Sequence, residues 1–134
     1  MLRYAEIDTP GPEDIINHWN SVPNLPKVRG GKTAYRSKAI KILEFWIEEG
    51  YSVDELKTHI DKYAGQKLSH AYYTKYVGEE PKWNSKFWCP NTNWTIVDCF
   101  GTGSRFDKYY PVWEQRTAWT QDMLAQWLAK KLYG

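Results

Sequence analysis

The sequence is poor in cysteine, with only Cys89 and Cys99, and this scarcity excludes a scaffold held together by many disulfides. One bridge between the two thiols is possible, but two cysteines in a chain of this kind are more often free. No C-x-x-C occurs, and His18, His59 and His70 lack the spacing of a metal site. We therefore expect free thiols and neither a structural zinc nor another metal or cofactor.

Long apolar runs are also missing. No stretch approaches the roughly 18 residues of a membrane span, and the opening MLRYAEIDTP lacks the apolar core of a signal peptide. A net charge of +2 in 134 residues excludes a strongly basic or acidic molecule, so an electrostatic partner must be recognised through local charge. We expect one soluble domain located in the cytoplasm, or in the host cytoplasm if the protein is encoded by a phage.

Catalytic motifs are absent as well. There is no G-x-G-x-x-G, and no Ser-His-Asp arrangement can be assembled. Gly31-Lys32-Thr33 matches only the end of a P-loop, because the first glycine of that motif would fall at Pro26 and no strand precedes it. The acidic residues crowd at solvent-facing or helix-capping positions, namely Glu44, Glu48, Glu49, Asp54 and Glu55. We predict that the protein is not an enzyme.

Aromatic residues are abundant, at 16% of the chain, and no convincing run of alternating apolar and polar residues occurs. Apolar residues at three- and four-residue steps predict a helix from about Thr33 to Glu49, ended by Gly50. Ser52-Val53-Asp54-Glu55 is a capping box that starts the next helix, which we expect to stop at Gly65. The fold class is therefore predicted as all-α, a single domain of five to six short helices with long aromatic-rich loops and little or no sheet.

Further helices are expected on both sides of this central pair. Residues 1–10 are an extended lead-in, and Pro12 suits the first turn of a short helix. We expect the helices at 33–49 and 52–65 to form a hairpin with Tyr51 at its corner. After the hairpin, Ser69 is expected to cap a short helix that ends at Gly78.

The second half of the chain predicts two more helices. Asn91 or Thr92 can cap the first, which Gly101 or Gly103 would end. The last helix is expected either to be capped by Thr120 or to begin near Val112, and it forms the C-terminal segment 111–134.

Positive charge is concentrated in one window of the sequence. Between Asp14 and Glu44 there is no acidic residue, and the window carries six cations: Lys27, Arg29, Lys32, Arg36, Lys38 and Lys41. Gly30 and Gly31 precede the predicted start of a helix, where free backbone N–H groups and the helix dipole favour a phosphate. A solvated face next to a flexible turn accounts for the same pattern equally well.

Tyrosines alternate with cations just after the predicted hairpin. Tyr72, Tyr73 and Tyr76 are interleaved with His70 and Lys75. Rings beside cations suit single-stranded nucleic acid, since bases stack on rings while lysines neutralise phosphates. Packing of these rings in the core and at its rim is the alternative.

The order of several motifs resembles the small helical, C-terminal-type domain of phage and prophage replication proteins, the replisome organisers and replication initiators. The motifs are IINHWN at 15–20, a basic linker broken by prolines, EGYSVDEL at 49–56, IDKY at 60–63, Trp88, and WTIVDCFGTGSRFDKY at 94–109. The resemblance covers roughly residues 13–110. We expect a departure from the family at each end: the winged-helix DNA-reading domain that usually precedes this module has no counterpart in residues 1–12, and 111–134 adds a C-terminal helix.

The resemblance implies a non-enzymatic accessory protein of phage-type DNA replication. Such a protein would bind DNA, above all single-stranded DNA, or dock on the host replicative helicase machinery. The residues expected to contact nucleic acid are Lys27, Arg29, Lys32, Arg36, Lys38, Lys41, Tyr72, Tyr73, Lys75, Tyr76 and Arg105.

Two alternatives stay open at this point. Exposed Trp and Tyr are typical of protein interfaces, so the chain could be a phage-encoded module that inhibits or redirects a host protein, including a defence nuclease. A structural domain with no separable ligand is the third interpretation. Aromatic rings within a basic groove would favour nucleic acid, and an aromatic patch away from the basic residues would favour a protein partner.

Overall fold

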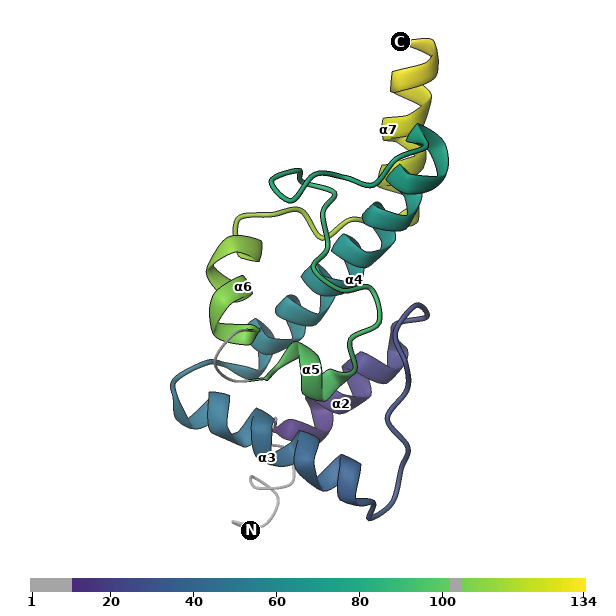
Figure 1. Cartoon of the computed structure of the whole chain (residues 1–134). Coiled ribbons are helices and arrows are strands. Elements are labelled where there is room, and N and C mark those ends of the chain that lie inside the picture. The colour runs from purple at the N-terminus through teal and green to yellow at the C-terminus, as the bar shows by residue number, and fades with distance from the viewer. Residues whose placement is uncertain (1–10, 102–104) are drawn as a thin grey trace.

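The protein is built from α-helices, as the computed structural model shows for residues 11–101 and 105–134 (Figure 1). Six helices and no strand lie in these ranges, which confirms the predicted all-α class. The helices are α2 Pro12–Ser21, α3 Ala34–Glu48, α4 Val53–Val77, α5 Ile96–Cys99, α6 Phe106–Trp113 and α7 Gln121–Tyr133. The expected lead-in at 1–10 and the stop at Gly103 lie outside the described residues.

The long helix α4 organises the fold. Its 25 residues extend over roughly 37 Å, and α2, α6 and α7 all pack against it. At one end of the molecule α3 packs on α2 and α5, while at the other end α7 continues past the last turns of α4 (Figure 1). The two ends of the molecule therefore carry different surfaces.

The joint between α3 and α4 follows the predicted chemistry. Gly50 has φ +110°, the left-handed conformation that favours glycine. The Ser52 hydroxyl accepts from the Glu55 N–H at 3.0 Å, and the Glu55 carboxylate accepts from the Ser52 N–H at 2.9 Å, so the capping box is confirmed. The expected hairpin is wrong, because α3 packs on α2 and α5 and points away from α4 (Figure 1).

Gly65 does not stop a helix, contrary to the prediction. It lies inside α4 and is fully packed, and a Cβ atom built on it would lie 2.4 Å from the backbone nitrogen of Trp119. The missing side chain lets the segment before α7 approach the helix backbone, which is why glycine occurs here. Ser69 is likewise inside α4, where its hydroxyl donates to the Gln66 carbonyl, and the true stop is Gly78 at φ +88°.

One expectation for the second half was also wrong, and one of two alternatives was confirmed. Neither Asn91 nor Thr92 caps α5; Thr95 does, by accepting from the Asp98 N–H. For the last helix, two starts were predicted as alternatives. It does not begin near Val112, because this residue already belongs to α6, and it is capped by Thr120. The helices are short here and the loops between them are rich in aromatic residues, so local sequence signals alone did not identify which residue caps each helix.

The core is a network of aromatic rings from several helices and from the loop before α5. Tyr63 of α4 stacks on Trp19, Trp94 and Trp113, with ring centroids 5.3–6.2 Å apart. Trp46 of α3 packs on Phe106 at 4.4 Å, and His59 connects Phe106 to Trp113. Both cysteines are buried free thiols. Among the described helices, none is both long and apolar enough to cross a membrane.

Candidate nucleic-acid interface

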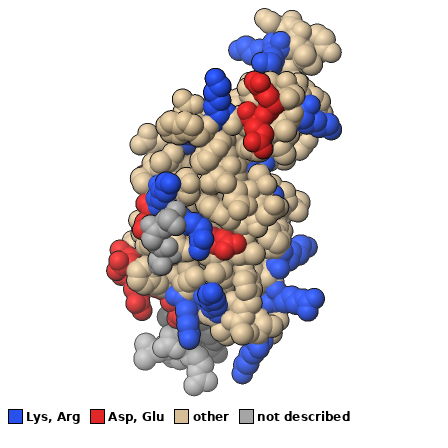
Figure 2. All heavy atoms as spheres, viewed as in Figure 1, with Lys and Arg blue, Asp and Glu red and all other residues tan. Residues whose placement is uncertain are grey.

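Five of the six predicted cations lie exposed on one side of the molecule. They occupy the segment 22–33 and the outward side of α3, a surface that we call the basic face: Lys27, Arg29, Lys32, Lys38 and Lys41. Figure 2 shows Lys and Arg side chains gathered over α3 and the segment before it. None of the five forms an ion pair with another described residue.

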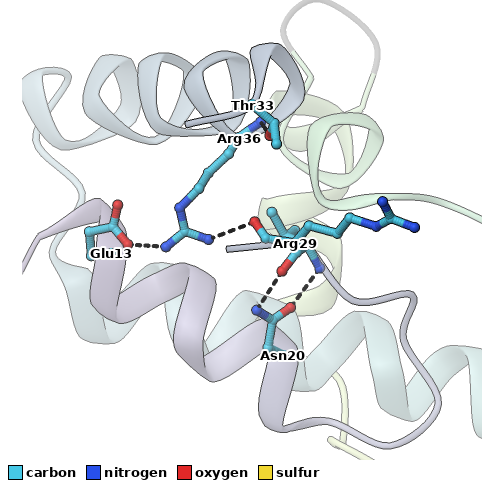
Figure 3. A network of polar contacts seen from close by, with 6 residues as sticks. Glu13, Asn20, Arg29, Thr33 and Arg36 are labelled. Carbon is cyan, nitrogen blue, oxygen red and sulfur yellow. Dashed lines mark hydrogen bonds and ion pairs between the residues drawn. The ribbon is translucent and has the colours of Figure 1, made fainter. Parts of the chain in front are cut away.

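The sixth cation, Arg36, has a structural partner instead. Its guanidinium forms an ion pair with Glu13 of α2 and donates to the carbonyl oxygen of Arg29 at 3.2 Å (Figure 3). Arg36 therefore ties α3 to α2 and to the end of the segment 22–33. The side chain of Arg29 points away from this network (Figure 3). Arg29 is therefore available to contact a phosphate, whereas the guanidinium of Arg36 is already paired with Glu13.

The backbone that carries the basic face is held in place. The Asn20 side chain donates to the Val28 carbonyl at 2.9 Å and accepts from the Val28 N–H at 2.7 Å (Figure 3). The Trp19 indole donates to the Pro26 carbonyl at 2.6 Å, and the Val28 side chain is buried. Residues 26–28 are thus anchored by side chains of α2, just before the Gly30-Gly31 step that was interpreted as a flexible turn.

One ring on the basic face was missed in the sequence. Phe45 is 43% exposed and lies on the same outward side of α3 as Lys38 and Lys41, at steps of three and four residues. Tyr35 is 39% exposed, but it lies next to the buried side of α3, and its hydroxyl accepts from the Val97 N–H of α5 at 3.4 Å. Counting the polar side of the predicted helix, as well as its apolar side, would have identified Phe45.

Charge is segregated in space as it is along the chain. The acidic residues of 44–55 lie in the second half of α3 and at the corner between α3 and α4, at the other end of α3 from Lys32. Lys27, Arg29 and Lys32 precede α3, whereas Glu44 follows Lys41 by three residues and is its neighbour on the helix surface. The acids therefore weaken the positive potential more at Lys41 than at the segment 22–33.

The predicted tyrosines do not join the basic face. They lie in the last turns of α4, at the opposite end of the molecule from α3 (Figure 1). Tyr73 packs on Phe87 and Trp127, and Tyr72 packs on Tyr76, with the Lys75 ammonium over the Tyr76 ring. Tyr73 therefore joins α4 to α7 and to the loop before α5, whereas Tyr72 and Tyr76 form a partly exposed pair on α4 itself.

Arg105 is also placed by packing. It precedes α6, is half-buried, and lies against Gly101, where a Cβ atom would meet its Nε at 2.6 Å. The structure thus brings together five of the eleven predicted residues. Arg36 is paired with Glu13, and Arg105 lies against Gly101. The other four lie in the last turns of α4: Tyr72, Tyr73, Lys75 and Tyr76.

A cleft of about 340 Å³, which we call the aromatic cleft, opens between the segment 83–88 and α6. Trp83 stands at its edge and is 77% exposed, and Val112 is 45% exposed. Its other lining residues include Trp88, Tyr109, Lys108 and Asn84. No sequence signal indicated this cleft, because its two walls are about 20 positions apart in the chain.

The described residues contain no cluster of three or more His, Cys, Asp or Glu that could hold a metal ion. Comparison with family models, with curated proteins and with solved structures gives no match to this chain.

Proposed function

We propose that this protein is a non-catalytic accessory factor of phage-type DNA replication that acts in the host cytoplasm and binds single-stranded DNA through the basic face. One observation carries the proposal: five exposed cations share a side of the molecule without ion pairs to described residues, and acidic residues begin only at Glu44, in the second half of α3. Lysine and arginine arranged in this way neutralise successive phosphates of a strand.

Single strands are favoured over duplexes by the ring on the same face. Phe45 lies beside Lys38 and Lys41 on the outward side of α3, and a base can stack on such a ring only when it is not already stacked in a duplex. Contacts to phosphates and stacked bases carry little sequence information, so binding is expected to be nearly independent of sequence. Tyr72 and Tyr76 are too far from α3 to serve the same stretch of strand.

Charge reversal tests the proposal. In the double variant Lys38→Glu, Lys41→Glu, affinity for a 20-nucleotide strand should fall on the order of tenfold or more, for (dT)20 and for a mixed sequence alike. The matched control is Lys130→Glu, Lys131→Glu, which makes the same change in net charge on exposed lysines of α7. Fluorescence anisotropy gives the affinities, and circular dichroism checks the fold. Equal losses in both variants, or no loss in either, would contradict the proposal.

A protein-interaction module is the second candidate, and α7 is the observation that favours it. The last turns of α7 extend beyond the rest of the molecule (Figure 1) and expose Ala125, Ala129 and Leu132 along one side, with Leu132 at 63% exposure. Apolar residues at i, i+4 and i+7 are the pattern by which a helix docks in a groove of a partner. The partner would be the host helicase machinery or another host protein.

This candidate is tested by capture from host lysate with the full chain. Leu132→Glu should abolish retention of a specific host protein, while Gln126→Glu, which introduces the same charge on another exposed side of α7, should not. Retention that is unaffected by Leu132→Glu would exclude the end of α7 as the docking site.

A further inference from the structure

Trp83 is unusual among the tryptophans of this protein. All eight lie in the described residues, and the other seven are buried or half-buried, whereas Trp83 is 77% exposed. It stands at the edge of the aromatic cleft, beside Trp88 and Tyr109. A large ring left in water next to other rings marks a surface to which a planar ligand can be added.

The charges around the cleft are positive. Lys108 and Arg116 line it, and none of its lining residues is acidic. Lys82 and Lys86 are exposed on the segment that carries Trp83, and so are Glu79 and Glu80, neither of which lines the cleft. Nearby acids do not enter the cleft: Asp107 and Glu114 are exposed on α6 and just after it, and Glu114 lines a separate hollow beside His59. A ligand that fits this cleft is therefore planar, largely apolar and negatively charged.

The polar groups at the rim suit a base and its phosphate. The Asn84 amide offers donors and an acceptor to the edge of a base, without a fixed preference for one base. The Lys108 ammonium lies 5.3 Å from the centre of the Tyr109 ring, where it can reach a phosphate whose base lies on the rings. Arg116 donates to the Ser85 carbonyl at 3.1 Å and so holds the two walls of the cleft together.

The size of the cleft limits what it can take. At about 340 Å³ it is at the lower end of ligand sites, which begin near roughly 300 Å³, and it suits one nucleotide better than a folded partner. A base can enter only when it is unstacked, so the ligand must come from a single strand or a chain end. We infer that the aromatic cleft binds one unstacked nucleotide, with its base on Trp83 and its phosphate at Lys108.

This subsite rests on the proposed function, since it assumes that nucleic acid is the ligand, but it is a separate contact. In Figure 1 α6 lies on one side of α4, and the segment 22–33 lies on the other. A short oligonucleotide can therefore occupy the aromatic cleft without touching the basic face. This separation lets the two proposals fail independently.

The experiment uses 5′-phosphorylated (dT)3 as the probe and the indole N–H signals of the full chain, observed by ¹⁵N NMR, as the readout. The indole N–H signal of Trp83 is assigned as the one that is missing from the spectrum of Trp83→Leu. Adding (dT)3 should shift the Trp83 signal more than those of the buried tryptophans, and Trp83→Leu should weaken binding on the order of 5- to 100-fold while Trp83→Tyr retains it. The variant Lys38→Glu, Lys41→Glu should bind (dT)3 as the wild type does.

Three outcomes would overturn the inference. The first is an unmoved Trp83 signal at saturating (dT)3. The second is an equal shift with deoxyribose 5-phosphate, which would show that charge alone is recognised. The third is a shift with a short acidic peptide containing Trp but none with (dT)3, which would assign the cleft to a protein partner. If instead Lys38→Glu, Lys41→Glu leaves (dT)20 binding unchanged while Trp83→Leu still weakens (dT)3 binding, the basic face fails and the cleft stands.

Discussion

Tyr63 joins α4 to the loop before α5 through its hydroxyl group and to α2 and α6 through its ring. The hydroxyl donates to the Asn91 carbonyl and accepts from the Trp94 N–H, both at 2.9 Å, while the ring stacks on Trp19, Trp94 and Trp113. Burial raises the pKa of Tyr63, so the hydroxyl stays protonated and can act as donor and acceptor at once. A buried ring of this kind contributes apolar area and also positions the loop before α5.

His59, in contrast to Tyr63, is a buried polar residue with one ring nitrogen that lacks a hydrogen-bond partner among the described residues. It is 2% exposed, stacks on Trp113 and meets the edge of Phe106, and its Nε2 has no hydrogen-bond partner among the described residues. Burial lowers the pKa of His59 from 6.5 to about 3. The ring is therefore neutral in the folded protein at neutral pH.

Acid should destabilise the protein through His59. Between pH 6.5 and about 3 the unfolded chain binds a proton that the folded chain does not, so stability present above pH 6.5 is lost as the pH falls, by about 1.4 kcal/mol per pH unit from this group. Urea unfolding at several pH values measures it. His59→Leu should flatten this dependence, whereas Phe100→Leu in the same cluster should lower stability and keep the slope. Parallel slopes in His59→Leu and the wild type would contradict the assignment.

The two thiols should be unreactive in the folded protein. Burial raises the pKa of Cys89 to about 11 and the pKa of Cys99 well above its usual value, which makes the reactive thiolate of Cys89 roughly a hundredfold scarcer. A thiol reagent should detect both groups in denaturant without reductant and neither under native conditions. Cys89→Ser should halve the count in denaturant. Fewer than two thiols in the denatured wild type would indicate a disulfide.

At the scale of single elements, α3 has two sides with separate tasks. One side buries Ala39, Leu43 and Trp46, and the Trp46 indole donates to the Phe100 carbonyl at 2.8 Å. The other side carries Lys38 and Lys41 into solvent. Because the buried side fixes the rotation of the helix, the packing of α3 also fixes the direction of the basic face.

The capping box of α4 can be tested by Ser52→Ala. The change removes the acceptor for the Glu55 N–H and should cost on the order of 1 kcal/mol of unfolding free energy. Chemical denaturation measures it, with Thr58→Ala at an exposed interior position of the same helix as the control. A melting temperature that is the same in Ser52→Ala and the wild type would show that the box adds nothing.

Gly65→Ala tests the contact between α4 and the segment before α7. Alanine is the better helix former by about 1 kcal/mol, but its Cβ atom would lie 2.4 Å from the Trp119 nitrogen and 3.0 Å from the Ala118 carbonyl carbon. Backbone atoms cannot yield as a side chain does, so we expect a net loss of roughly 1–3 kcal/mol. Gly30→Ala, with nothing within 4 Å of the new atom, is the control. A stabilised Gly65→Ala variant would refute the close approach.

Taken as a whole, the molecule separates its surfaces along the direction of α4. The basic face lies at the end formed by α2, α3 and α5, whereas the aromatic contacts of Tyr73 with Phe87 and Trp127 lie at the end formed by α7 (Figure 1). With a net charge of only +2, long-range attraction to DNA is modest, and binding depends on the local concentration of positive charge.

The salt dependence of DNA binding reports on all cations of the basic face together. If the five cations of the basic face each neutralise a phosphate of a single strand, the logarithm of the affinity should fall against the logarithm of salt concentration with a slope of about −3.5, from five contacts at about −0.7 each. Lys38→Glu, Lys41→Glu should make the slope shallower by at least about 1.4. Anisotropy titrations between low and moderate salt measure both. Binding that does not change with salt would exclude phosphate contact as its source.

Short-range signals in the chain predicted much of the fold. The starts of α3, α4 and α7 at Thr33, Ser52 and Thr120 were predictable because a cap depends on residues only three positions apart. Gly65 was misread because the same residue that ends helices also permits close approach, and only the neighbouring segment decides between the two. For the candidate site, the sequence indicated the five exposed cations but not the loss of Arg36 to Glu13, its partner from α2.

By itself, the sequence of this protein determined its helical class, its principal caps and the separation of basic and acidic stretches, because these depend on neighbours along the chain. Only the tertiary structure decided that the tyrosines of α4 lie far from the cations and that Trp83 stands at the edge of a cleft. The tyrosines lie far from the cations because the 25 residues of α4 separate its two ends. The cleft forms because two segments that are distant in the sequence pack side by side, and such a contact leaves no periodic pattern in the chain.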